Sequence, residues 1–310
     1  MKANEMQKKK MTGNGFLLLI TIALFVVMYI AGMIIFADKG FAKPQMFLNL
    51  FVSNAGLLVI ACGLTIVMIT GGIDISVGSV TALVCMVLAD LMENKGVNTY
   101  VAVLVALLIG VAFGIVQGFL VAYLDIQPFI VTLAGMFFGR GMTAIISTDM
   151  ISIKNELFLK WANYRFYMPF GSTNKFGRKL YAIGGSRQSA LMMGLNVKKT
   201  MFQAYVLDGF LAGLGGFLFC LNSCAGFVEQ AKGLEMDAIS SAVIGGTLLS
   251  GGVGTPIGTL FGVLIKGTIS SLITTQGTLS SWWVRIILSA LLCFFIVIQS
   301  VIASMKKKNK

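Results

Sequence analysis

The sequence is short of charged residues and contains no histidine. Only 12% of its 310 residues are charged and 57% are hydrophobic, with a mean hydropathy of +0.88. A soluble domain does not need so much apolar surface, so the composition indicates a protein that crosses the membrane several times. Without histidine the chain lacks the commonest metal ligand and the usual general base. The five cysteines lie in or beside apolar runs, where cysteine behaves as a small hydrophobic residue. We therefore expect no metal site.

Two kinds of functional site are also absent from the sequence. No G-x-x-x-x-G-K-[ST] loop is present, and this loop is the usual cradle for nucleotide phosphates. No set of residues supplies a nucleophile, a base and an oxyanion site together. We therefore expect a protein that is not an enzyme, has no catalytic residue and binds no cofactor of its own.

The net charge of +12 does not indicate nucleic acid as a partner, because many of the basic residues gather at the two ends of the chain. The lysines at these ends are Lys2, Lys8, Lys9, Lys10, Lys306, Lys307, Lys308 and Lys310. Such clusters beside apolar helices are typical of cytoplasmic anchors. We predict a lipid bilayer as the partner, with cytoplasmic tails at residues 1–14 and 305–310.

Apolar segments long enough to form membrane helices recur along the chain. The predicted fold is an all-α polytopic membrane protein, a single transmembrane domain over residues 1–310. The third and seventh segments are short, so we expect broken or partly re-entrant helices there. The nine segments are 15–37, 46–70, 76–92, 99–124, 128–147, 201–222, 237–249, 254–274 and 283–304.

The number of segments conflicts with the predicted position of the tails. Two cytoplasmic tails require an even number of crossings, and the sequence contains nine segments. The basic loop at 177–199 is predicted to be cytoplasmic, yet the fifth segment leaves the chain outside at residue 147. Either one span is missing near residues 148–177, or the segment 128–147 enters the membrane and returns without crossing.

A polar motif rich in glycine interrupts two of the apolar stretches. Residues 71–78 and 245–252 both read G-G-x-x-x-S-x-G. Irregular backbone at membrane depth is tolerated where protein or a water-filled cavity satisfies it, and paired breaks of this kind indicate a transport path. The alternative is close packing of helices through small residues.

Asp74 in the first motif favours a function, since an acid within the bilayer is costly without a partner. It could bind substrate hydroxyls, pair with Arg140, or cap the start of a helix, and we expect the cap. For Arg140, Lys266 and Asp208 we expect positions at which the side chain reaches an interface.

Four segments together resemble the permease subunits of bacterial ABC importers for monosaccharides, the group for ribose, xylose and galactofuranose. They are residues 63–79, 128–136, 181–186 with Gly194, and 244–255 with Gly258 and Thr259. The resemblance covers residues 15–305, and residues 277–283 are most similar to the galactofuranose-type permeases. Members of this family have ten spans, so the resemblance implies that a helix of roughly 20 residues has been lost near 148–177.

The resemblance also implies roles for particular residues. The loop 177–199 would contain a coupling helix that contacts a separate ATPase subunit, although an ordinary basic loop would look the same. Its coupling residues would be Gly184, Gly185, Ser186, Arg187, Gln188, Ser189, Ala190 and Gly194. We expect Ala190 and Leu191 to pack below Arg187 and Gln188. Candidates for the translocation path, with helix packing as the alternative, are Gly71, Gly72, Asp74, Ser76, Phe129, Thr132, Gly245, Gly246 and Ser250.

The implied assembly is a sugar importer in the bacterial plasma (inner) membrane. ATP and magnesium would bind to the ATPase subunit. The remaining partners would be a second permease subunit, forming a homodimer or a heterodimer, and an extracytoplasmic sugar-binding protein. Two alternatives stay open: a secondary transporter or channel that works alone, and a truncated permease that no longer transports.

Overall fold

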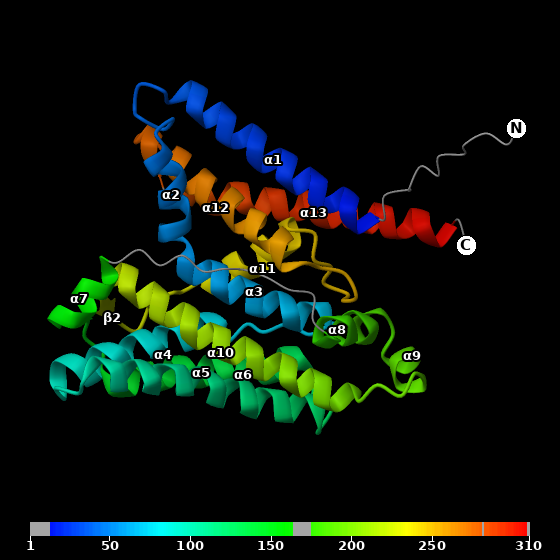
Figure 1. The fold of residues 1–310 in the computed structure, drawn as a ribbon, viewed down its shortest axis with the longest axis horizontal. Helices are drawn as coiled ribbons and strands as arrows, with labels where there is room; N and C mark the ends of the chain where they lie inside the picture. Colours follow the sequence, from blue (N-terminus) through cyan, green and yellow to red (C-terminus); the bar gives the residue numbers. More distant parts are fainter. Residues whose placement is uncertain (1–12, 164–174, 281, 309–310) are drawn as a thin grey trace, which may run out of the picture.

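The computed structural model describes residues 13–163, 175–280 and 282–308, and it consists almost wholly of helices (Figure 1). Two residues each form the strands β1 and β2, which pair antiparallel with Ile151 opposite Gly226. The elements are α1 (Gly13–Ile35), α2 (Pro44–Ser53), α3 (Ala55–Ile69), α4 (Val77–Ala89) with a π-helical turn (Asp90–Asn94), α5 (Thr99–Ala122), α6 (Pro128–Ile146), β1 (Ile151–Ser152), α7 (Glu156–Ala162), α8 (Lys175–Gly185), α9 (Arg187–Met192), α10 (Val197–Ser223), β2 (Ala225–Gly226), α11 (Leu234–Ile244), α12 (Pro256–Gln276) and α13 (Trp282–Lys308).

All nine predicted apolar segments contain helix, which confirms the all-α polytopic fold. Seven helices within the described residues are long and apolar enough to cross a membrane. The helices α2 and α3 together are also long and apolar enough to cross, with a bend of 56° between them, and they would make an eighth span if the pair crosses as one. The remaining segment yields α11, whose 11 residues are too few to span a bilayer alone.

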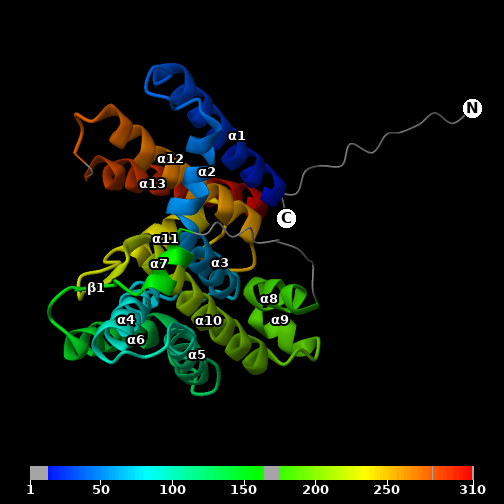
Figure 2. The same ribbon diagram turned by 60° about the vertical axis from the view of Figure 1, so that its left-hand side comes forward.

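The molecule has two distinct ends along its long axis (Figure 1). One end carries α8 and α9, together with the start of α1 and the end of α13. We name this the α8 end. The opposite end carries β1, β2 and α7, and we name it the β1 end. Figure 2 shows that α1, α12 and α13 form one side of the molecule, whereas α4, α5 and α6 form the other.

The helix α10 lies in the interior and packs closely on α5. A Cβ atom at Gly110 would lie 2.8 Å from the Cα of Gly213, and one at Gly209 would lie 2.7 Å from the Cα of Gly114. Glycines four residues apart on each helix therefore let the two backbones touch, as in other membrane helix pairs. The same helix packs on α3, which is buried along nearly its whole length.

The helix α6 decides between the two explanations of the odd number of spans. It is continuous over 19 residues and is followed by β1 at the β1 end. The alternative in which 128–147 enters the membrane and returns is therefore wrong, because an unbroken helix of this length crosses. The chain still has to return to the α8 end before α8 begins.

The helices on either side of residues 164–174 lie far apart along α10. Near the β1 end, the rings of Trp161 and Phe217 have centroids 6.4 Å apart. Near the α8 end, Leu180 packs with Ala204. These two contacts are about 20 Å apart along the α10 axis, at 1.5 Å of rise per residue. The interval 164–174, near which the sequence predicts a missing span, thus connects opposite ends of the molecule.

Candidate functional site

The first glycine motif forms a non-helical segment, residues 70–76, between α3 and α4. Gly71 has a φ of +86°, a conformation that favours glycine, and it turns the chain after α3. The hydroxyl of Thr132 on α6 donates to the carbonyl oxygen of Ile73 at 3.2 Å. The amide of Gln117 on α5 donates to Ser76 Oγ at 2.8 Å. Side chains of α5 and α6 therefore hold this segment, and the bond from Thr132 satisfies one of its backbone carbonyls, as the membrane interior requires.

Asp74 is buried in this segment and bonds to Ser76, the residue that precedes α4. Its Oδ1 accepts hydrogen bonds from the backbone N–H and the hydroxyl of Ser76, both at 2.7 Å. Asp74 therefore holds the turn before α4 and does not cap the helix, because the N-cap residue is Ser76 and it makes no side-chain cap bond, so the predicted cap is wrong. The alternative, a pair with Arg140, is also wrong, since Arg140 bonds to Val228 and Gln230.

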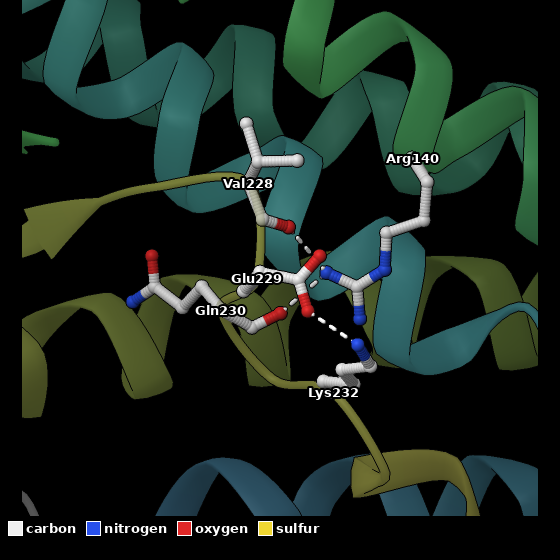
Figure 3. Close-up of polar contacts among 5 residues, drawn as sticks. All are labelled: Arg140, Val228, Glu229, Gln230 and Lys232. Atoms are coloured by element: carbon white, nitrogen blue, oxygen red, sulfur yellow. Dashed lines mark hydrogen bonds and ion pairs between the residues drawn. The ribbon is translucent and has the colours of Figure 1, made fainter. Parts of the chain in front are cut away.

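Arg140 instead fastens α6 to the segment that leads from β2 to α11 (Figure 3). Its Nη1 donates to the carbonyl oxygens of Val228 at 2.8 Å and Gln230 at 2.6 Å. Beside it, Glu229 and Lys232 form an ion pair at 2.5 Å, and this contact lowers the pKa of the Glu229 carboxyl. Arg140 is therefore a clamp and does not extend freely to an interface.

The second glycine motif forms the turn between α11 and α12, and it lies against the first motif. The N–H of Gly252 donates to the carbonyl oxygen of Ile69, the last residue of α3, at 2.9 Å. A Cβ atom at Gly251 would lie 2.8 Å from the N of Gly71, and the carbonyl of Ser250 also faces Gly71. Two breaks that are far apart in the sequence are thus in direct contact at the α8 end.

The end of α8 joins both breaks. The hydroxyl of Tyr181 donates to the carbonyl oxygen of Gly254 at 2.5 Å. A side chain at Gly184 would meet the carbonyl oxygen of Ile69 and the backbone of Gly252. The predicted coupling segment therefore touches the two predicted path segments directly, through backbone that only glycine leaves accessible.

The helix α9 presents a polar face to solvent. The hydroxyl of Ser186 accepts a hydrogen bond from the N–H of Ser189 at 3.2 Å, which caps the helix. Ala190 is buried and Gln188 is exposed, as predicted. Leu191 is 57% exposed, so the expectation that it packs below is wrong. The turn after α9 uses Gly194 at a φ of +74°.

Arg187 is exposed as predicted and also pairs within the chain. Its Nη2 donates to Asp125 Oδ1, between α5 and α6, at 2.6 Å. The hydrogen bond and charge of Arg187 lower the pKa of the Asp125 carboxyl. Sequence reasoning missed Met192 and Met193, which follow on α9 with exposed fractions of 79% and 65%. The sequence did contain a signal for these two methionines, because apolar residues within a basic loop have no core in which to pack.

The remaining path candidates do not gather at this site. Phe129 on α6 is half exposed, so its ring lies outside the buried segment that the breaks form. Gly245 packs on Gly258 and Thr259, so it brings α11 against α12, and Gly246 has a φ of +91° in the turn after α11. These positions fit the helix-packing alternative.

A polar hollow of about 380 Å³ lies beside the Arg140 clamp, between α10, α12 and the segment after β2. Lys266 and Asp237 form an ion pair across it at 3.3 Å. Lys266 therefore forms this ion pair and does not reach an interface as predicted. The interface position predicted for Asp208 is also wrong, because its side chain is fully buried. Residues lining the hollow are Phe219, Ser223, Phe227, Glu229, Gln230, Ala231, Lys232, Leu234, Asp237 and Lys266.

Comparison with known proteins assigns the chain to a family. The profile of the family described as "Branched-chain amino acid transport system / permease component" matches residues 46–160 and 166–296. The chain belongs to this permease family. It is thus a multi-pass membrane protein with a transport role.

Several relatives of this family member are similar over most of their length. The inner membrane ABC transporter permease protein YjfF of Escherichia coli K12 is 40% identical, with 91% of each chain covered. The fructose import permease protein FruG of Bifidobacterium longum is 32% identical over 94% of this chain and 93% of the relative. The ribose import permease protein RbsC of Bacillus subtilis is 35% identical over 84% and 85%. No solved structure matches the chain.

Proposed function

We propose that this family member is the permease subunit of an ATP-driven importer for a monosaccharide in the bacterial inner membrane. Relatives over nearly the full chain include import permeases for ribose and fructose, which supports a sugar as cargo. The galactofuranose-type branch stays a prediction. The loop with α8 and α9 and both ends of the chain would face the cytoplasm, in agreement with their positive charge.

The observation that carries the proposal is the contact of α8 with both glycine breaks. Gly184 packs on Ile69, where α3 meets the first break, and on Gly252 of the second break, and Tyr181 bonds to Gly254 just after it. A movement of α8 therefore displaces backbone at both breaks. A subunit that binds α9 would therefore act on the proposed path without any long chain of intermediates. The exposed residues Arg187, Gln188, Met192 and Met193 supply charge and apolar surface for that subunit.

The energy source would be a separate ATPase subunit that binds ATP and magnesium. The 310-residue sequence has no phosphate-binding loop, which supports this division. A second permease subunit, identical or similar, would complete the path, and a sugar-binding protein would deliver cargo at the β1 end.

The hollow beside Arg140 is the proposed entry point for the sugar. Its volume of about 380 Å³ lies within the range of small-molecule sites. Phe219 and Phe227 offer apolar faces, while Asp237, Lys266 and Gln230 offer groups that bind hydroxyls. The segment that Arg140 holds in place forms one wall of the hollow.

The coupling role is tested by charge reversal in vesicles that contain the chain, the ATPase subunit and the binding protein. We expect Arg187→Glu to abolish uptake and ATPase co-purification. The negative charge of the glutamate would be repelled by a docking surface on the ATPase subunit that binds a cation. Lys154→Glu is the matched control, since Lys154 is exposed at the opposite end. Normal assembly and uptake with Arg187→Glu would refute the coupling role.

A second variant separates docking from the internal ion pair. Asp125→Arg combined with Arg187→Asp keeps an ion pair between these positions but reverses the sign presented by α9. If the pair alone matters, the double variant transports; if docking matters, it does not. Uptake by the chain alone, driven by a proton or sodium gradient, would instead establish the secondary transporter.

We also infer that the sequence lacks one span between residues 163 and 175. An α-helix over that interval is about 17 Å long, too short for the bilayer. The match to the family profile is interrupted at residues 161–165, where this interval begins. The YjfF alignment runs over 303 residues, whereas 91% of this chain is roughly 282 residues, so about 20 positions lack a counterpart. Re-reading the DNA across codons 165–180 tests whether the helix is absent from the gene.

A further inference from the structure

Two acids meet in the interior of the molecule without a cation beside them in the described part of the chain. Asp74 of the first break and Asp208 of α10 are both buried, and their carboxyl groups lie within hydrogen-bonding reach of each other. Among the described residues, no lysine or arginine pairs with either acid, and the chain contains no histidine. A buried ionised carboxylate without a partner is very costly, and two adjacent ones are more so.

Hydrogen bonding around these acids is incomplete in one respect. Oδ1 of Asp74 accepts two hydrogen bonds from Ser76, but both carboxyl oxygens of Asp208 lack a donor within residues 13–163, 175–280 and 282–308. The group that faces Asp208 is the Asp74 carboxyl, which is itself an acceptor. Two acceptors can be joined only by a shared hydrogen, and the acids of a close buried pair hold one proton between them.

Tyr205 is a third buried polar group beside the two acids. It lies one turn before Asp208 on α10, is fully buried, and its hydroxyl has no partner within the described residues. A phenol can donate to a carboxyl oxygen. The backbones of α3 and of the first break lie close to these side chains of α10. A Cβ at Gly63 would lie 2.6 Å from Asp208 Oδ1, and one at Gly72 would lie 2.6 Å from the Tyr205 hydroxyl.

We propose that Asp74 and Asp208 bind one proton between them and that this proton fastens the first break to α10. Apart from the two acids, the facing groups that the structure describes are neutral. They are Tyr205 from α10, Ser76 from the break, Gln117 from α5 and the backbone at Gly63 of α3. Loss of the proton leaves two negative charges in contact, and their repulsion separates the break from α10.

This inference deepens the proposed function, because it assigns Asp74 a role within the proposed path. Its test reads protonation and not transport, so the two proposals fail separately. Infrared difference spectra of the full chain in lipid nanodiscs should show the carbonyl stretch of a protonated carboxylic acid at neutral pH. The band should disappear in Asp74→Asn and in Asp208→Asn.

The matched control is Asp237→Asn, which removes an acid paired with Lys266 and should leave the band unchanged. A neutral-pH spectrum without the band, or a band that survives Asp208→Asn, would overturn the proposal. A spectrum without the band, together with stabilisation by sodium, would show that a metal cation takes the place of the proton.

Unfolding provides a second measurement that does not depend on the spectra. The folded chain holds a proton that the unfolded chain releases at neutral pH, so stability falls as the pH rises. We expect the melting temperature of the wild type to decline on the alkaline side, with less decline in Asp208→Asn, whose amide donates to Asp74 at every pH. An equal decline in both proteins would contradict a shared proton.

Discussion

Arg140 places a guanidinium group against two backbone carbonyls that otherwise have no partner among the described residues, those of Val228 and Gln230. Arg140→Met keeps much of the apolar stem and removes both donors. We expect a loss of about 2 kcal/mol in the free energy of unfolding, since an unsatisfied buried acceptor costs about 1–3 kcal/mol. Denaturant titration in detergent measures it. The matched control is Arg285→Met on the exposed face of α13, where Arg285 lies over the ring of Trp282. Equal losses in the two variants would contradict the clamp.

The Asp125–Arg187 contact makes the position of α9 sensitive to acid. Arg187 holds the pKa of the Asp125 carboxyl below its ordinary value. The contact is therefore fully formed above that ordinary value, and it is lost as the pH falls through the lowered one. We expect amide hydrogen exchange in α9 to quicken in acid. In Asp125→Asn it should be faster at neutral pH and should change less with acid. An unchanged acid response in that variant would show that another group titrates.

At the scale of elements, two adjacent glycines of α8 give a sharp comparison. A Cβ at Gly184 would meet the carbonyl oxygen of Ile69, whereas one at Gly185 meets nothing within 4 Å. We expect Gly184→Ala to separate α8 from the breaks and to reduce uptake at least tenfold, about 1.4 kcal/mol of lost coupling. Gly185→Ala should transport normally. Uptake assays with matched expression levels decide this, and equal activity of the two variants would show that α8 does not act through this contact.

The same elements show what could be predicted from the sequence. Apolar length located every span, and the polar break located the non-helical segment before α4, because both depend on local composition. The contact between residues 71 and 251 could not be predicted, since it depends on how α3 and α11 pack. For the same reason Asp208 was expected at an interface but is buried. Helix periodicity predicts which residues share a face of a helix, but the element that packs on that face is set by the tertiary structure.

At the scale of the whole molecule, the interval between residues 163 and 175 governs whether the two halves can sit in one membrane. The helix α7 precedes it at the β1 end and α8 follows it at the α8 end. Extended backbone could cover the distance at about 3.3 Å per residue, but exposed peptide groups in lipid have no partners. Under the proposed orientation the positive-inside rule would place the α8 end of both halves in the cytoplasm, so the conflict falls on this one interval.

Insertion of a helix in this interval tests that reasoning. A designed segment of about 20 leucine and alanine residues between residues 163 and 175 supplies one crossing. We expect it to raise membrane accumulation and, with the partner subunits, uptake above that of the chain as it stands. An insertion of equal length made of glycine and serine is the control, because it adds reach but cannot satisfy its backbone in lipid. Labelling of cysteines introduced at Lys154 and Lys179, in a background without the native cysteines, should then report opposite sides of the membrane. Equal rescue by both insertions would show that length alone was lacking, and no rescue by either would show that the fold already tolerates the shorter connection.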